Sequence, residues 1–279
     1  MIKISPDEYK VTTEYIYELS GIMLAASKTY LVETRLSPLV EEYGCASFSE
    51  FYYKAKADRS RALENRIINA ITTRETLFFR DTAPFELLQY KILPELIDLK
   101  RAQGGICGKI PIRIWSAACS TGQEAYSAAM ALKEMLPDTS AYDIRIVGTD
   151  ISDAAVAAAS YGTYNRFEVE RGLSQGKLSK YFEMQGDDWK IKDEIRLMTS
   201  FRKFNLFHDL HALGQFDIVF CRNVAIYFTA EDRKQLFHRI ADILPAHGAL
   251  IIGSSEYLAG VCDRFKSNTH MKSVYYTLA

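Results

Sequence analysis

An apolar segment, a bend of small residues and an alanine-rich stretch follow one another between residues 112 and 136, and this order constrains the fold more than any other feature. Segment 112–115 is rich in β-branched and aromatic residues, which is typical of a buried strand. The bend 116–122 contains only small side chains, and apolar residues then recur at helical spacing until Pro137, which is expected to end the helix. Strand, bend and helix form the first half of a nucleotide-binding βαβ unit, in which a ligand lies against the backbone at the helix N-terminus.

The bend differs from a phosphate-binding loop. No Lys-Ser or Lys-Thr pair follows Gly122, and the helix opens with Gln123 and Glu124. An acidic side chain at this position repels a pyrophosphate, but it suits a ligand that carries hydroxyl or cationic groups. The sequence therefore indicates a small-molecule site that is not built for phosphate.

A second predicted strand, 144–150, ends in Asp150, and Ser152 is expected to cap the helix that follows. In nucleotide-binding sheets an acidic residue at this strand end binds ribose hydroxyls. The alternative is that Asp150 is an ordinary turn residue before a capped helix. We favour the ribose role because the small-residue bend precedes it.

Polar residues also follow two further predicted strands. Asn205 and Leu206 lie at one strand end, and the apolar strand 216–221 runs into Arg222 and Asn223. Ligands of open α/β sheets bind at the carboxyl ends of the strands. These side chains are therefore expected to converge with Asp150 on one edge of the sheet.

Composition excludes several classes of protein. The chain has 279 residues and a formal net charge of −1, which disfavours a dedicated nucleic-acid binder. No apolar run reaches the roughly 18 residues of a membrane span, so we expect no membrane insertion. The 5 cysteines are scattered without a CxxC pair, as in a reduced, cytoplasmic protein. His208 and His211 lie three residues apart, but a metal site would need two more ligands, so a solvated turn is favoured and no metal site is expected.

Residues 1–72 are expected to form a separate helical domain. Residues 5–8 match a capping box with proline at the first helical position, and a second helix over 29–43 is expected to kink or restart at Pro38. The domain either braces the rest of the chain or presents a recognition surface. Its basic stretch, 54–66, is interpreted as a solvated helix face, with a dock for an acidic helical partner as the alternative.

The remaining segments complete the expected architecture. Residues 73–81 are predicted to form a structured loop that closes over the site, followed by a helix over 83–103. Short strands near 189–191 and 195–197 indicate a small β insertion at about 163–200. Segment 272–278 is predicted to be the last strand and to close the sheet.

Five motifs occur in an order that resembles the CheR family, whose members use S-adenosylmethionine to esterify glutamates on chemotaxis receptors. The motifs are TLFFRD at 76–81, WSAACSTG at 115–122, GTDIS at 148–152, NL at 205–206, and FCRN at 220–223 followed by IYF at 226–228. The resemblance spans nearly the whole chain. It implies a class I methyltransferase-like α/β fold with a mostly parallel doubly wound sheet and an antiparallel last strand. The implied domains are helical 1–72, a loop and linker helix over 73–111, and a Rossmann-like catalytic domain over 112–279.

The resemblance also implies the positions that bind the cofactor. Two departures concern them: Gln123 replaces the first Glu of the family's Gly-Glu-Glu turn, and Arg74 stands where some members have Asn. Arg80 is expected to clamp a carboxylate of the cofactor, and Tyr227 either lines the methyl channel or only packs beside Phe228. The implied cofactor-binding residues are Arg74, Thr76, Arg80, Glu124, Asp150, Asn205, Leu206, Arg222 and Asn223, and the implied catalytic residues are Arg80 and Tyr227.

The implied function is methylation of glutamates in the cytoplasmic helical domain of methyl-accepting chemotaxis receptors, by a cytoplasmic monomer. Some members bind a receptor's C-terminal pentapeptide through a glycine-containing loop of the β insertion. Here the corresponding segment, 182–189, is short and has one glycine, so we expect no such tether. Two alternatives stay open: a class I methyltransferase for another protein or a small molecule, and a non-catalytic module that senses the cofactor or its demethylated product.

Overall fold

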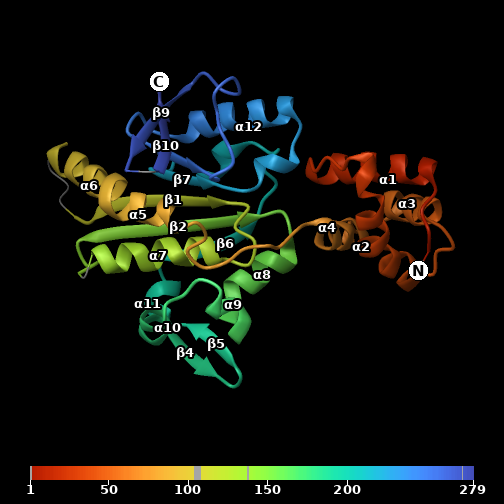
Figure 1. Cartoon of the computed structure of the whole chain (residues 1–279), viewed down its shortest axis with the longest axis horizontal. Coiled ribbons are helices and arrows are strands. Elements are labelled where there is room, and N and C mark those ends of the chain that lie inside the picture. Colours follow the sequence, from red (N-terminus) through yellow and green to blue (C-terminus); the bar gives the residue numbers. More distant parts are fainter. Residues whose placement is uncertain (1, 104–107, 137, 272) are drawn as a thin grey trace.

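The computed structural model describes residues 2–103, 108–136, 138–271 and 273–279. Pro137 and Lys272, which the sequence analysis placed at a helix end and a strand start, lie outside these ranges. Within them, a helical unit stands beside an α/β sheet, and a small β insertion lies below the sheet in the view of Figure 1.

The helical unit is built from short amphipathic helices around its own apolar core. The capping box at its start is confirmed: the Ser5 side chain accepts from the Glu8 N–H, and the Glu8 carboxylate accepts from the Ser5 N–H. The helix does not restart at Pro38, because one helix continues through this residue. The elements are α1 (Pro6–Ser20), η1 (Ala26–Lys28), α2 (Thr29–Glu42), α3 (Phe48–Ala57) and α4 (Ala62–Ile71).

The predicted helix over 83–103 is divided into α5 (Ala83–Leu87), a π-helical turn (Leu88–Ile92) and α6 (Leu93–Ala102). The Leu93 N–H donates to the Leu88 carbonyl, one residue further back than in an α-helix. Pro94 follows at once and has no N–H to continue the α-helical ladder. The widened turn therefore coincides with the proline.

The described residues form a seven-stranded sheet in the order β6-β2-β1-β7-β8-β10-β9 (Figure 1). The neighbours from β6 to β8 are parallel, whereas β10 runs antiparallel to β8 and β9 antiparallel to β10. The last strand was expected to close the sheet, but β9 lies outside it at the edge. The strands are β1 (Ile110–Ala117), β2 (Tyr142–Asp150), β6 (Thr199–Lys203), β7 (Ile218–Cys221), β8 (Ala249–Ile252), β9 (Phe265–His270) and β10 (Ser273–Leu278).

Helices cover both faces of the sheet, so its central strands are buried on both sides. Along β7, Ile218 and Phe220 face a core shared with α5, α6 and α7 (Gln123–Met135), while Val219 and Cys221 face a core shared with α12 (Ala230–Ile243). This period-2 alternation explains why the strand reads as a continuous apolar run. Helix α8 (Asp153–Tyr161) follows β2.

The strand predicted near 189–191 is confirmed, whereas the strand predicted near 195–197 is wrong. The three-stranded order is β3-β5-β4, with a tight hairpin between β4 and β5. Residues 193–196 form a helical turn: the Leu197 N–H donates to the Asp193 carbonyl (2.9 Å), and the Arg196 guanidinium donates to the Asp193 carboxylate (2.9 Å). The elements are β3 (Thr163–Tyr164), α9 (Arg166–Glu170), α10 (Gln175–Tyr181), β4 (Phe182–Gln185), β5 (Asp188–Ile191) and α11 (Asp193–Arg196).

No helix in the described part of the chain is long and apolar enough to cross a membrane.

Candidate active site

A cavity of about 320 Å³ lies at the carboxyl ends of β1, β2, β6 and β7. The chain passes from β1 to β2 and β6 on one side and then returns to β7 on the other side of β1. This is the switch point at which open α/β sheets bind ligands. All site residues expected from the sequence line the cavity: Arg74, Thr76, Arg80, Glu124, Asp150, Asn205, Leu206, Arg222, Asn223 and Tyr227.

The small-residue bend after β1 forms the floor of the cavity in an unusual backbone conformation. Ala118, Ser120 and Gly122 have φ of 55°, 51° and 96°. The Cys119 N–H donates to the Thr149 carbonyl (2.8 Å), which ties the bend to β2. A Cβ on Gly122 would lie 2.9 Å from the Cβ of Ala159 in α8, so a larger residue does not fit. Side chains are small here because backbone conformation and packing both require it.

Asp150 is held by the backbone on both sides of its carboxylate. Oδ2 accepts from the Ser120 N–H and Oδ1 from the Ser152 N–H, both at 2.9 Å. The residue is only 8% exposed, and this burial raises the pKa of its carboxyl although the backbone bonds oppose the shift. Each oxygen keeps a lone pair for a ligand, so the geometry fits an acceptor of hydroxyl donors.

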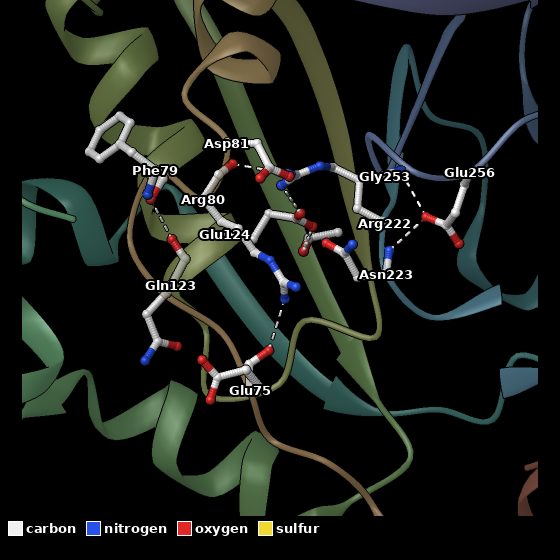
Figure 2. A network of polar contacts seen from close by, with 12 residues as sticks. Glu75, Phe79, Arg80, Asp81, Gln123, Glu124, Arg222, Asn223, Gly253 and Glu256 are labelled. Atoms are coloured by element: carbon white, nitrogen blue, oxygen red, sulfur yellow. Dashed lines mark hydrogen bonds and ion pairs between the residues drawn. The ribbon is translucent and has the colours of Figure 1, made fainter. Parts of the chain in front are cut away.

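Arg222 joins three elements around the cavity (Figure 2). Its Nη1 lies 2.9 Å from Glu124 Oε2, and its Nη2 lies 2.7 Å from Asp81 Oδ2 and 2.9 Å from the Arg80 carbonyl oxygen. Its side chain is 1% exposed. Both terminal nitrogens are thus engaged by the protein itself, and the structure makes Arg222 a support for the wall more than a free donor.

The loop that was expected to cover the site is strongly anchored. Phe79, Asp81 and Thr82 have φ of 50°, 67° and 40°, and the Phe79 N–H donates to Ser127 Oγ (2.9 Å) on α7. The buried Phe78 ring meets Phe182 of the β insertion edge-on, with centroids 5.4 Å apart. The loop is therefore fixed between the sheet domain and the β insertion, while Arg80 faces the cavity.

The Arg80 guanidinium donates from Nη1 to the Glu75 carbonyl oxygen (3.1 Å; Figure 2). It is partly buried and lines the cavity. Its remaining donors can bind a ligand carboxylate.

The helical unit supplies a wall that the sequence analysis missed. Ser20, the last residue of α1, and Ile22, just after this helix, line the cavity. The Met23 N–H donates to the Tyr227 carbonyl (2.9 Å), and the Asn205 side-chain amide donates to the Leu19 carbonyl (3.2 Å). No local sequence signal marks these positions, because they reach the site only through domain docking.

Glu256 was also missed. Its Oε2 accepts from the Asn223 N–H and the Gly253 N–H, both at 2.8 Å (Figure 2). Asn223 has a left-handed φ of 57°, and Gly253 has no room for a Cβ, which would lie 2.4 Å from Glu256 Oε2. The signal was a carboxylate three residues beyond a glycine that follows β8.

The comparisons with known proteins agree with this geometry. Residues 74–274 match the model of the CheR methyltransferase SAM-binding domain, and residues 7–72 match the CheR methyltransferase all-alpha domain. The chain is 39% identical to a chemotaxis protein methyltransferase of Vibrio parahaemolyticus over 99% of this chain and 98% of that protein. It is 40% identical to chemotaxis protein methyltransferase 1 of Pseudomonas aeruginosa over 93% of each chain.

A solved structure, a TehB-like SAM-dependent methyltransferase from Corynebacterium glutamicum, covers 66% of this chain and 83% of its own at 13% identity. Its TM-score is 0.36.

The fold and the site define a class I methyltransferase that uses S-adenosylmethionine. The chain belongs to the CheR methyltransferase family. The comparisons confirm the fold, the methyl donor and the enzyme class that the sequence predicts, a CheR-type methyltransferase.

Proposed function

We propose that the cavity binds S-adenosylmethionine with its ribose hydroxyls on Asp150 and its methionine carboxylate on Arg80. The observation that carries this proposal is a buried carboxylate, fixed by two backbone N–H groups, at the switch point of the sheet. The cavity volume falls within the roughly 300–1,000 Å³ of small-molecule sites. The donors and acceptors around it suit a ligand with hydroxyl, amino and carboxylate groups.

The other cavity residues take distinct roles in this proposal. Asn205, Leu206 and Asn223 contact the cofactor from the ends of β6 and β7, and Thr76 and Arg74 contact it from the closing loop. Glu124 and Arg222 line the cavity while forming a pair with each other, so part of their contribution is to hold the wall. We also retain as a proposal the division into domains 1–72, 73–111 and 112–279, with the β subdomain at about 163–200.

Little acid–base chemistry is required of the protein. When bound, S-adenosylmethionine supplies an activated methyl group. A glutamate side chain, with an ordinary pKa of about 4.3, is already ionised at neutral pH, so no general base is needed. The residues around the cavity orient the two partners and exclude water; orientation alone can contribute roughly 7–11 kcal/mol.

Tyr227 lines the cavity with 37% of its surface exposed, at the side where α1 ends. We propose that its hydroxyl faces the path of the incoming carboxylate. Packing beside Phe228 is the simpler alternative, and a Tyr227→Phe variant with unchanged kcat would favour that alternative.

The proposed substrate is the cytoplasmic helical domain of methyl-accepting chemotaxis receptors, modified in the cytoplasm by a monomer. Much of the basic stretch in the helical unit is used internally: Lys56 pairs with Glu18 and Arg66 with Glu42, both at 2.7 Å. This favours a solvated helix face over a dedicated dock for an acidic helix.

We propose that no receptor pentapeptide binds the β insertion. The β4–β5 hairpin turns over Gly186 and Asp187 alone, with φ of 65° at Gly186, and offers no longer glycine loop. Calorimetric titration with a receptor C-terminal pentapeptide should give no measurable heat. A micromolar dissociation constant would contradict this proposal.

Incubation with radiolabelled S-adenosylmethionine and receptor-containing membranes tests the proposed function. Base-labile methyl label should appear on receptors, because a carboxyl methyl ester is hydrolysed by base. Binding of the cofactor without transfer to receptors would indicate another substrate or a sensor module.

A further inference from the structure

Helix α4 of the helical unit ends beside the Asp150 site, and one side chain connects the two. Asn69 Oδ1 accepts from Ser152 Oγ (2.7 Å), and Asn69 Nδ2 donates to Asp153 Oδ1 (2.6 Å). Ser152 is fully buried, and its own N–H donates to Asp150 Oδ1. A chain of hydrogen bonds thus runs from the helical unit to the carboxylate, although Asn69 does not line the cavity.

The same residue is linked to the opposite carboxylate oxygen. The Asn69 carbonyl accepts from Arg74 Nη2 (3.3 Å), and the Arg74 carbonyl accepts from Ser120 Oγ (3.3 Å). The Ser120 N–H donates to Asp150 Oδ2 (2.9 Å), which closes a ring of hydrogen bonds through both carboxylate oxygens. On this side, the side chains of Arg74 and Ser120 and the backbone groups of Asn69, Arg74 and Ser120 connect α4, the closing loop and the bend.

We propose that Asn69 is a positioning residue for the cofactor site, through which docking of the helical unit fixes Asp150 and the small-residue bend. The inference rests on the proposed ribose role of Asp150. Its consequence is that the helical unit completes the methyl-donor site instead of only presenting a surface to the receptor.

The test compares two asparagines of the same helix. Asn69→Ala breaks the ring, whereas Asn65→Ala removes only the bond that Asn65 Oδ1 accepts from Lys203 Nζ at the same domain boundary. Binding of S-adenosylhomocysteine is measured by calorimetry for both, with a thermal unfolding midpoint for each. Asn69→Ala removes the bonds to Ser152 and Asp153, of which only the first leads to Asp150. It should weaken binding roughly three- to tenfold, about the value of that single bond, and Asn65→Ala by less than about twofold.

A thermodynamic cycle separates positioning from a general structural effect. In an Asp150→Ala background, Asn69→Ala should cause no further loss of affinity, because the side chain that is removed leads to Asp150 through Ser152, whereas the arm to the bend uses the Asn69 carbonyl, which alanine keeps. An equal loss with and without Asp150, or an equal loss from Asn65→Ala, would overturn the inference while leaving the proposed function intact. A wild-type chain that does not bind S-adenosylhomocysteine would instead overturn the proposed function and, with it, this inference.

Discussion

The guanidinium of Arg222 and the carboxylate of Glu124 form a buried ion pair, with Nη1 and Oε2 2.9 Å apart, that joins the end of β7 to the start of α7. The second Glu124 oxygen accepts from Ser116 Oγ at 2.7 Å, and the second terminal nitrogen of Arg222 holds Asp81 of the closing loop. One arginine therefore binds the loop, the helix and the strand around the cavity.

Replacing Arg222 by alanine should destabilise the protein strongly, because it leaves the largely buried Glu124 carboxylate without its cation and releases the exposed Asp81. Removal of one partner of a buried pair costs about 3–5 kcal/mol, measurable as the free energy of unfolding in urea. The control is Arg166→Ala, which removes an exposed i,i+4 pair with Glu170 and should leave the midpoint unchanged. Equal midpoints for wild type and Arg222→Ala would refute this role.

Glu256→Ala should weaken the binding of S-adenosylhomocysteine although Glu256 itself is outside the cavity. Its carboxylate holds the left-handed Asn223 in the wall, and its loss leaves two backbone N–H groups unpaired, at about 1–3 kcal/mol for each buried donor. Glu256→Gln keeps an oxygen acceptor and should bind nearly as wild type. Calorimetry that finds no difference between the alanine and glutamine variants would count against this role of Glu256.

Arg80→Ala should abolish methyl transfer and leave the fold intact. The loop is anchored by the Phe79 N–H and by the Arg80 carbonyl, and neither contact uses the guanidinium. The measurement is transfer of labelled methyl groups to receptor membranes, with circular dichroism to verify folding. Arg80→Lys keeps the charge without the two-pronged donor and should be intermediate. A folded alanine variant with the wild-type rate would contradict the proposal that Arg80 holds the cofactor.

As the pH is lowered, cofactor affinity should begin to fall at a higher pH than it would if Asp150 had the pKa of an ordinary aspartate. Burial raises the pKa of Asp150, and the ionised form is the stronger acceptor for ribose hydroxyls. As the pH falls through this raised pKa, the carboxylate is protonated and affinity is lost; above it, affinity is constant. Titrations of S-adenosylhomocysteine at a series of pH values upward from the ordinary aspartate pKa of about 3.9 should show this step, which Asp150→Asn should lack.

Much of the site could be predicted because its residues are local to strand ends. The bend 116–122, Asp150 and Asn223 each follow an apolar run, and parallel strands bring such ends together. Other features could not be predicted in this way. Domain docking brings Ser20 and Asn69 to the site, and loop packing brings Glu256 to Asn223.

The errors in the fold have similar physical causes. Strand β9 is an edge strand whose residues between Phe265 and His270 are largely polar and exposed, so it lacks the apolar run that marked the central strands. Residues 195–197 contain alternating apolar side chains, yet Ile195 is buried within a short helix. Short apolar runs do not distinguish the two structures.

Calorimetric titration of the wild type and of Asp150→Ala with S-adenosylhomocysteine measures how much of the affinity depends on the Asp150 carboxylate. If the cavity holds the ribose on Asp150, the variant loses charge-assisted hydrogen bonds worth about 1.5–3 kcal/mol, and its dissociation constant rises roughly 10- to 150-fold. A folded Asp150→Ala variant that binds as tightly as the wild type would contradict the account.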